Sequence, residues 1–164
     1  MENKSIIDTL KSRFGEDLLK VDESSDMLAF TVSRGIIHEC IKYLKEEPFL
    51  QFDFLTDLTG IHYPEQELPL GIIYHMHNLR ENKRLRIKTF VPLGDPSVKS
   101  ICNLFSSANW MERETFDFYG ILFEGHPNLK RILNVEYMDY FPMRKEYPLE
   151  DQTREDKDNR FFGR

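Results

Sequence analysis

The chain has 164 residues and a formal net charge of −6 at pH 7. This length is typical of one domain with a core of its own, and the acidic balance argues against a general nucleic-acid-binding surface. The apolar runs are far shorter than the ~20 residues of a membrane helix, and the N-terminus lacks the apolar stretch of a signal peptide. Cys40 and Cys102 match no metal- or cluster-binding spacing, so we expect two reduced thiols in a soluble protein.

The first elements follow in a clear order along the chain. Apolar residues at helical spacing predict a helix over residues 5–14, before Gly15. A short strand is predicted over 28–32, and a second helix over 36–46. Three strands are predicted after it, over residues 49–59, 72–77 and 85–91. The last two should form an antiparallel hairpin around a polar turn.

Two more helices are predicted before residue 120. The first begins at Asp95, and its apolar face comprises Val98, Ile101, Cys102 and Phe105. The second covers residues 110–119, with Asn109 as N-cap, Glu112 in a capping box and Gly120 after its end. This order predicts an α+β fold of two layers, in which helices pack on a mixed or antiparallel sheet.

The character of the sequence changes near residue 134. We expect residues 1–133 to form the compact domain and residues 134–164 to form an extended C-terminal tail. The tail has many Tyr, Phe and Pro residues but no helical or strand period, whereas a disordered segment would have few aromatic residues. We interpret it as a strap that becomes ordered on a partner protein; the alternative is that it packs on its own domain.

Histidines and basic residues of the central strands are two candidate sites. His75 and His77 point to one face of a predicted strand, and with His62 they form a candidate metal site without a firmly spaced third ligand. The next strand alternates basic residues along one face, namely Arg84, Arg86 and Lys88. They form either a solvated face or a basic surface for an acidic partner.

The densest group of charges is Glu112, Arg113, Glu114 and Asp117. On a helix, Arg113 and Asp117 are an i,i+4 pair. Glu112 and Glu114 diverge by about 200° around the axis, so they cannot act together on one substrate as acid and base. We therefore interpret this group as structural.

These charges begin a stretch that resembles the signature of the C subunit family (NuoC-like) of respiratory complex I. The family pattern has ERE, an acid, two large apolar residues, a His, a basic residue and two aliphatic residues; it is filled here by Glu112, Arg113, Glu114, Asp117, Phe118, Tyr119, His126, Lys130, Ile132 and Leu133. Residues 52–60 resemble the family's FDxLxDLT motif, and residues 142–149 resemble its HPLRKDFPL motif. Phe141 stands where many members have His. The resemblance marks these signature and interface residues: Glu112, Arg113, Glu114, Asp117, Tyr119, Gly120, His126, Pro127, Lys130, Arg131, Arg144 and Lys145.

The resemblance implies a non-catalytic scaffold subunit in the peripheral arm of complex I, which supports electron transfer from NADH to quinone coupled to proton translocation. It implies packing chiefly against the D subunit, and also against the B and I subunits, at the cytoplasmic face of the inner membrane. It implies no catalytic, cofactor or metal residue on this chain, with FMN and iron–sulfur clusters on other subunits. Two alternatives stay open: the equivalent subunit of a related complex fed by ferredoxin or another donor, and a stand-alone metal enzyme using His62, His75 and His77.

Overall fold

The computed structural model describes residues 2–23 and 27–148. These residues form the α-helices α1 (Asn3–Phe14), α2 (Ile37–Glu46) and α3 (Ala108–Tyr119), and the short 3-10 helices η1 (Gly15–Asp17) and η2 (Arg34–Ile36). The strands are β1 (Leu18–Asp22), β2 (Leu28–Val32), β3 (Phe54–His62), β4 (Leu70–Asn78), β5 (Lys83–Val91), β6 (Ser97–Lys99) and β7 (Leu122–Glu124).

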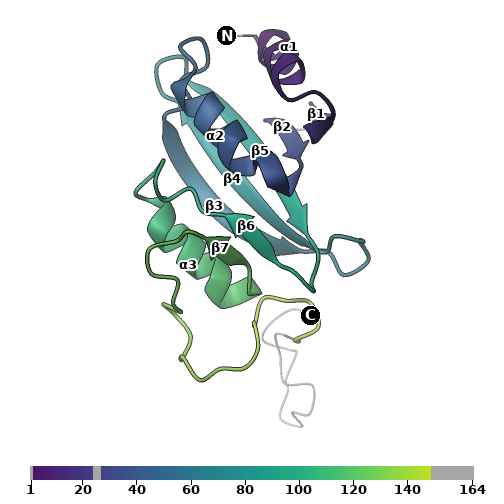
Figure 1. The fold of residues 1–164 in the computed structure, drawn as a ribbon, viewed down its shortest axis with the longest axis vertical. Helices are drawn as coiled ribbons and strands as arrows, with labels where there is room; N and C mark the ends of the chain where they lie inside the picture. The colour runs from purple at the N-terminus through teal and green to yellow at the C-terminus, as the bar shows by residue number, and fades with distance from the viewer. Residues whose placement is uncertain (1, 24–26, 149–164) are drawn as a thin grey trace, which may run out of the picture.

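Five of the strands form one mixed sheet in the order β1-β2-β5-β4-β3 (Figure 1). The pair β2–β5 is parallel and the other pairs are antiparallel, including the β4–β5 hairpin that the sequence predicts. Strands β6 and β7 form a small parallel sheet of their own. The predicted α+β fold with helices on a mixed sheet is therefore confirmed.

The described helices all lie on the same face of the five-stranded sheet. α1 contacts α2 through the rings of Phe14 and Tyr43, whose centroids are 5.7 Å apart. α3 packs on β3, where the Tyr119 ring lies against Gly60 so closely that no side chain would fit there. The apolar residues of this covered face form one continuous core with α1, α2 and the loops around β6.

The opposite side of the sheet, which we call the open face, carries half-buried and exposed side chains. Alternation along the central strands points these residues to it: Thr59, Ile61, Ile73, His75, Arg86, Lys88 and Phe90. The predicted alternation of basic residues along one face of β5 is confirmed, because the intervening Leu85, Ile87 and Thr89 are buried.

The helix predicted from Asp95 is wrong. β6 occupies its first half, and its backbone pairs with β7: the Leu122 N–H donates to the Pro96 carbonyl (2.8 Å) and the Ser100 N–H to the Glu124 carbonyl (2.9 Å). Val98, Ile101 and Phe105, which suggested a helix, are buried through a strand and turns instead, and Cys102 is half-buried. The sequence also missed β1, and it placed the start of β3 too early, because Gln51 has a positive φ of 45° and turns the chain before Phe54.

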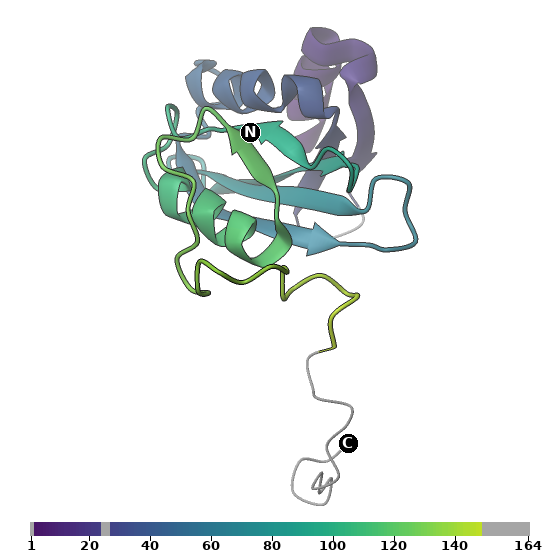
Figure 2. The same ribbon diagram turned by 60° about the horizontal axis from the view of Figure 1, so that its bottom comes forward.

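Residues 134–148 pack on their own domain and pass along α3 (Figure 2). The Met143 N–H donates to the Phe118 carbonyl (3.1 Å), and the Lys145 N–H donates to Nδ1 of His62 on β3 (2.9 Å). For residues 134–148 the structure therefore agrees with the alternative interpretation, in which the segment packs on its own domain. The part of the predicted tail from residue 149 onward lies outside the described residues, and the domain boundary at residue 133 stays a prediction.

Candidate functional site: the signature helix and its loop

The signature residues lie on α3 and on the loop that follows it. The helix begins at Ala108, directly after Ser107, and no side chain caps its N-terminus. The predicted Asn109 cap and the Glu112 capping box are therefore wrong, since both residues lie inside the helix. Its end is as predicted: Gly120 has a φ of 73°, and its N–H donates to the Phe116 carbonyl (2.8 Å).

Asp117 is the centre of the site. Its carboxylate is fully buried. Oδ2 accepts hydrogen bonds from three consecutive backbone N–H groups, those of Ile132 (3.0 Å), Leu133 (2.7 Å) and Asn134 (2.9 Å). Oδ1 accepts from Arg131 Nη1 (2.8 Å) and from Asn134 Nδ2 (3.0 Å). One side chain thus anchors the loop to the helix.

These donors also decide the ionisation of Asp117. Burial alone would raise its pKa, but the hydrogen bonds from Asn134 and Leu133, and then that from Arg131, hold the pKa well below the ordinary value of an aspartate. The group is therefore an ionised carboxylate with a fixed set of partners. It is unsuited to accept or release a proton near neutral pH.

Arg131 is the cation that pairs with Asp117, and it extends the anchor further along the chain. Its Nη2 donates to the carbonyls of Met138 (2.9 Å) and Tyr140 (2.9 Å), and its guanidinium lies 4.9 Å from the centre of the Phe141 ring. The predicted pair of Arg113 with Asp117 is not formed, because Arg113 turns outward to the loop. It donates to the carbonyls of residues 130 and 131 (3.1 and 3.3 Å) and stacks on Trp110.

Glu112 is the second buried carboxylate of the helix. Its oxygens accept hydrogen bonds from Ser100 Oγ (2.6 Å), the Ile101 N–H (2.7 Å) and Cys102 Sγ (3.3 Å). Burial raises its pKa, and the hydrogen bonds from Ser100, Ile101 and Cys102 offset part of that shift. Burial also raises the pKa of the Cys102 thiol, to about 11. Glu112 therefore ties α3 to the turn after β6.

Gly120 lies where helix, loop and C-terminal segment meet. A Cβ atom on this residue would lie 2.5 Å from the Phe141 ring, so a side chain has no room here. The Phe141 ring also contacts the guanidinium of Arg144, 4.7 Å from the ring centre, and Arg144 Nε donates to the Tyr119 carbonyl (2.8 Å). Phe141 is thus held between two cations, those of Arg131 and Arg144.

Comparisons with known proteins show the family of the chain. The family model described as "Respiratory-chain NADH dehydrogenase, 30 Kd subunit" matches residues 30–153. The chain belongs to this family, which contains the C subunit of NADH-quinone oxidoreductase. It is 37% identical to the C subunit of Citrifermentans bemidjiense over 154 residues (94% of each chain) and 42% identical to the C 2 subunit of Rhizobium meliloti over 138 residues (83% of this chain and 74% of the relative).

Two solved structures share the fold of this family member. One is Nqo5 in a trypsin-resistant fragment (1-134), with a TM-score of 0.68 and 24% identity over 79% of this chain and 100% of the other. The second belongs to an archaeal membrane-bound sulfane sulfur reductase, with a TM-score of 0.73 and 20% identity over 91% of this chain and 87% of the other. Within residues 2–23 and 27–148, no helix is long and apolar enough to span a membrane.

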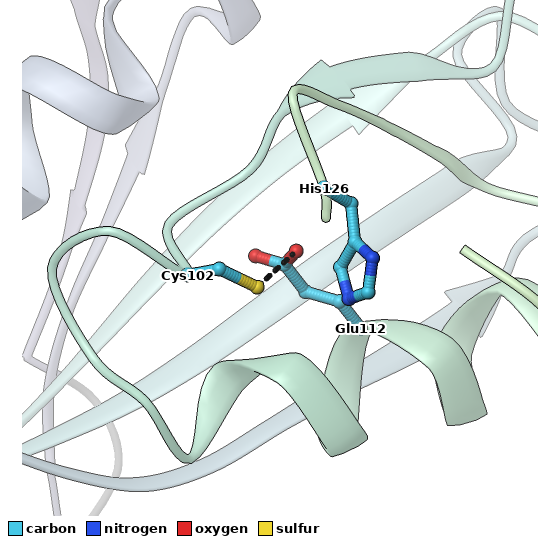
Figure 3. A group of neighbouring side chains, drawn as sticks. All are labelled: Cys102, Glu112 and His126. Atoms are coloured by element: carbon cyan, nitrogen blue, oxygen red, sulfur yellow. Dashed lines mark hydrogen bonds between the residues drawn. The ribbon is translucent and has the colours of Figure 1, made fainter. Parts of the chain in front are cut away.

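One group in this family member offers metal-ligating atoms close together. Atoms of Cys102, Glu112 and His126 lie within 4.8 Å of one another (Figure 3). Both nitrogens of His126 are already engaged, since Nε2 donates to the Asn109 carbonyl (3.0 Å) and Nδ1 accepts from the Asn128 N–H (3.0 Å). A metal would have to replace these bonds, because a ligating nitrogen needs a free lone pair. The three residues fit a hydrogen-bonded structural cluster better than a metal centre.

The three histidines of the candidate metal site are not brought together among the described residues. Their ring nitrogens have separate partners: His62 accepts from the Lys145 N–H, His75 lies 3.3 Å from Asp57, and His77 lies 3.2 Å from Asn82. This separation removes the basis for the stand-alone metal enzyme.

The remaining signature residues are exposed. They are Glu114, Pro127, Lys130 and the side chain of Lys145. The roles of Ser100, Ile101 and His62 were not predicted, because their partners are 11 to 83 residues away along the chain. The alternating spacing that predicts strands carries no signal for such distant pairs.

Proposed function

We propose that this chain is a non-catalytic scaffold subunit in the peripheral arm of complex I, where it supports electron transfer from NADH to quinone. The proposal depends on one observation: charged residues of the signature form hydrogen bonds within the chain. Asp117 and Arg131 are engaged in internal hydrogen bonds that fix α3 to its loop, and Glu112 is engaged in hydrogen bonds that fix α3 to the turn after β6. Groups held in this way give a surface a defined shape, but they are not free to bind substrate.

The surface shaped by this anchor supports a docking role. Large apolar side chains remain exposed along α3 and its loop: Trp110 is 63% exposed, Leu133 65% and Tyr137 88%. Exposed aromatic side chains on a rigid backbone are typical anchors of protein interfaces. We propose that this surface, comprising these three residues, packs chiefly against the D subunit, with the B and I subunits as neighbours.

The proposal assigns the redox groups to other subunits. FMN and iron–sulfur clusters would be carried elsewhere in the complex, and this chain would contribute no ligand to them. It would be held peripherally at the cytoplasmic face of the inner membrane through its partner subunits. In the alternative, a related complex fed by ferredoxin or another donor, this chain would have the same scaffold role. The two complexes would be told apart by the electron-input subunits that co-purify with the chain.

The test is retention of a tagged chain in the detergent-solubilised complex from the host's membranes. Leu133→Ser with Tyr137→Ser should lower the share of the chain that co-purifies with the D subunit. Leu19→Ser with Leu79→Ser is the matched control, because Leu19 and Leu79 are 60% and 59% exposed elsewhere. Equal retention of both variants would contradict the docking surface, and a wild-type chain that co-purifies with no other complex I subunit would contradict the proposed function itself.

A further inference from the structure

The open face of the sheet carries a cluster of cations. Arg84, Arg86 and Lys88 alternate along β5. Lys20 on β1 is opposite Thr31 of β2, and Thr31 is opposite Lys88. Since residues two apart on a strand are separated by about 6.7 Å and adjacent strands by about 4.8 Å, these cations cover an area of roughly 13 Å by 10 Å.

Most of these cations have no ion-pair partner within residues 2–23 and 27–148. Among the described residues, Lys20, Arg84 and Lys88 have no hydrogen-bond or ion-pair partner. The Arg86 Nε–H donates to His75 Nε2 (2.8 Å), and His75 Nδ1 in turn donates to Asp57 (3.3 Å).

Asp57 and Asp22 are carboxylates on this face of the sheet. Asp57 has His75 as its partner, and Asp22, beside the cations on β1, also has an interaction of its own. A concentrated positive area on a chain of net charge −6 is a local feature of this face and not a reflection of composition.

An apolar area borders the cations on the same face. Ile73 is opposite Lys88, and Ile61 and Phe90 flank Gly71, where a Cβ atom would lie 2.7 Å from each of them. The absence of a side chain on Gly71 lets these two residues close over the backbone. Arginine and aromatic side chains are enriched at protein interfaces.

We infer that the open face binds the acidic surface of a neighbouring protein subunit. This interface is separate from the docking surface around Trp110 and rests on the proposed function, because the partner belongs to the same complex. A protein partner is favoured over a lipid surface because Arg86 and Lys88 are half-buried on the face of a sheet, whereas binding to a lipid surface is typical of amphipathic helices with exposed cations. Carboxylates of the partner would meet the free cations at the positions of Lys20, Arg84 and Lys88.

The experiment uses the assembled complex, purified from host membranes through a different subunit. Lys20→Glu with Lys88→Glu changes two residues that make no hydrogen bond or ion pair with the described part of the chain. The matched control is Lys4→Glu with Lys11→Glu on α1, which are exposed and change the net charge equally. Retention of the chain is followed while the salt concentration is raised, since screening weakens such contacts.

We expect the open-face variant to be retained at least about ten-fold less than the control at low salt, as charge reversal across an interface is strongly repulsive. Equal retention of the two variants would overturn the inference. Normal retention of the open-face variant combined with lost binding of the purified chain to phosphatidylglycerol vesicles would also overturn it, in favour of a membrane contact. Failure of the wild-type chain to co-purify would contradict the proposed function and not this surface alone.

Discussion

Asp117→Asn is the substitution to which the fold should respond most strongly. The buried carboxylate accepts hydrogen bonds from three backbone N–H groups, from Asn134 and from Arg131. An asparagine keeps one acceptor oxygen and directs an NH₂ group at one of these sets of donors. It also leaves the Arg131 guanidinium, whose side chain is 8% exposed, without its counter-charge.

The size of the effect follows from these contacts. Removing one partner of a buried ion pair destabilises a protein by about 3–5 kcal/mol, and a domain of this size loses about 2–4 °C in Tm per kcal/mol. We therefore expect the free energy of unfolding to fall by about 3–5 kcal/mol and the Tm by roughly 6–20 °C. Glu114→Gln, an exposed control on the same helix, should change the free energy by less than about 0.5 kcal/mol.

The assay is urea unfolding of the purified chain, followed by circular dichroism at pH 7 and at lower pH. The folded-state pKa of Asp117 lies below the unfolded value of about 3.9. Its stabilising contribution is therefore fully present above about pH 4 and is lost progressively as the pH falls below that value. The gap between wild type and Asp117→Asn should narrow toward pH 3. A gap in the free energy of unfolding under about 1 kcal/mol at pH 7, or one that stays constant down to pH 3, would show that Asp117 is not a buried, ionised anchor.

Four further changes have defined outcomes in the same assay. Gly120→Ala should destabilise by at least about 1–3 kcal/mol, because it combines a left-handed backbone with a clash against Phe141; a neutral effect would mean that this junction is loose. Arg113→Ala should lower stability by only about 1 kcal/mol, since its hydrogen bonds are to loop carbonyls; a loss as large as that of Asp117→Asn would show that the two residues are coupled. Ser100→Ala should cost about 1–3 kcal/mol at pH 7, and less at pH 4, where Glu112, whose pKa is raised, binds a proton; an equal loss at both pH values would argue against an ionised Glu112. Truncation after residue 133 should lower the Tm, because residues 134–148 donate to Asp117, Tyr119 and His62; an unchanged Tm would favour an independent tail.

Local patterns in the sequence predicted the elements whose partners are close in the chain. The apolar stripe of α2 and the alternation of the β4–β5 hairpin both have strong short-range periods, and both agree with the structure. Gly120 was also predicted correctly, because a helix end with a positive φ has a local signature.

The elements that the sequence missed depend on distant partners. The spacing of Val98, Ile101 and Phe105 fits a helix, but pairing of β6 with β7, some 25 residues later, gives the backbone its hydrogen bonds. The i,i+4 spacing on a helix predicted Arg113 as the partner of Asp117, but Arg131 is the residue that donates to the buried carboxylate. The whole fold determines which arginine reaches the buried carboxylate, and local spacing along the helix does not encode it.

If the chain supports the complex without taking part in the chemistry, loss of its anchor should change assembly and not turnover. NADH–quinone turnover should be measured per assembled complex in a host whose only copy of the chain carries Asp117→Asn. We expect less assembled complex, because the anchor of α3 is lost, with turnover per complex equal to that of the wild type. Normal assembly with reduced turnover per complex would contradict this expectation and would assign the carboxylate a direct role in the reaction.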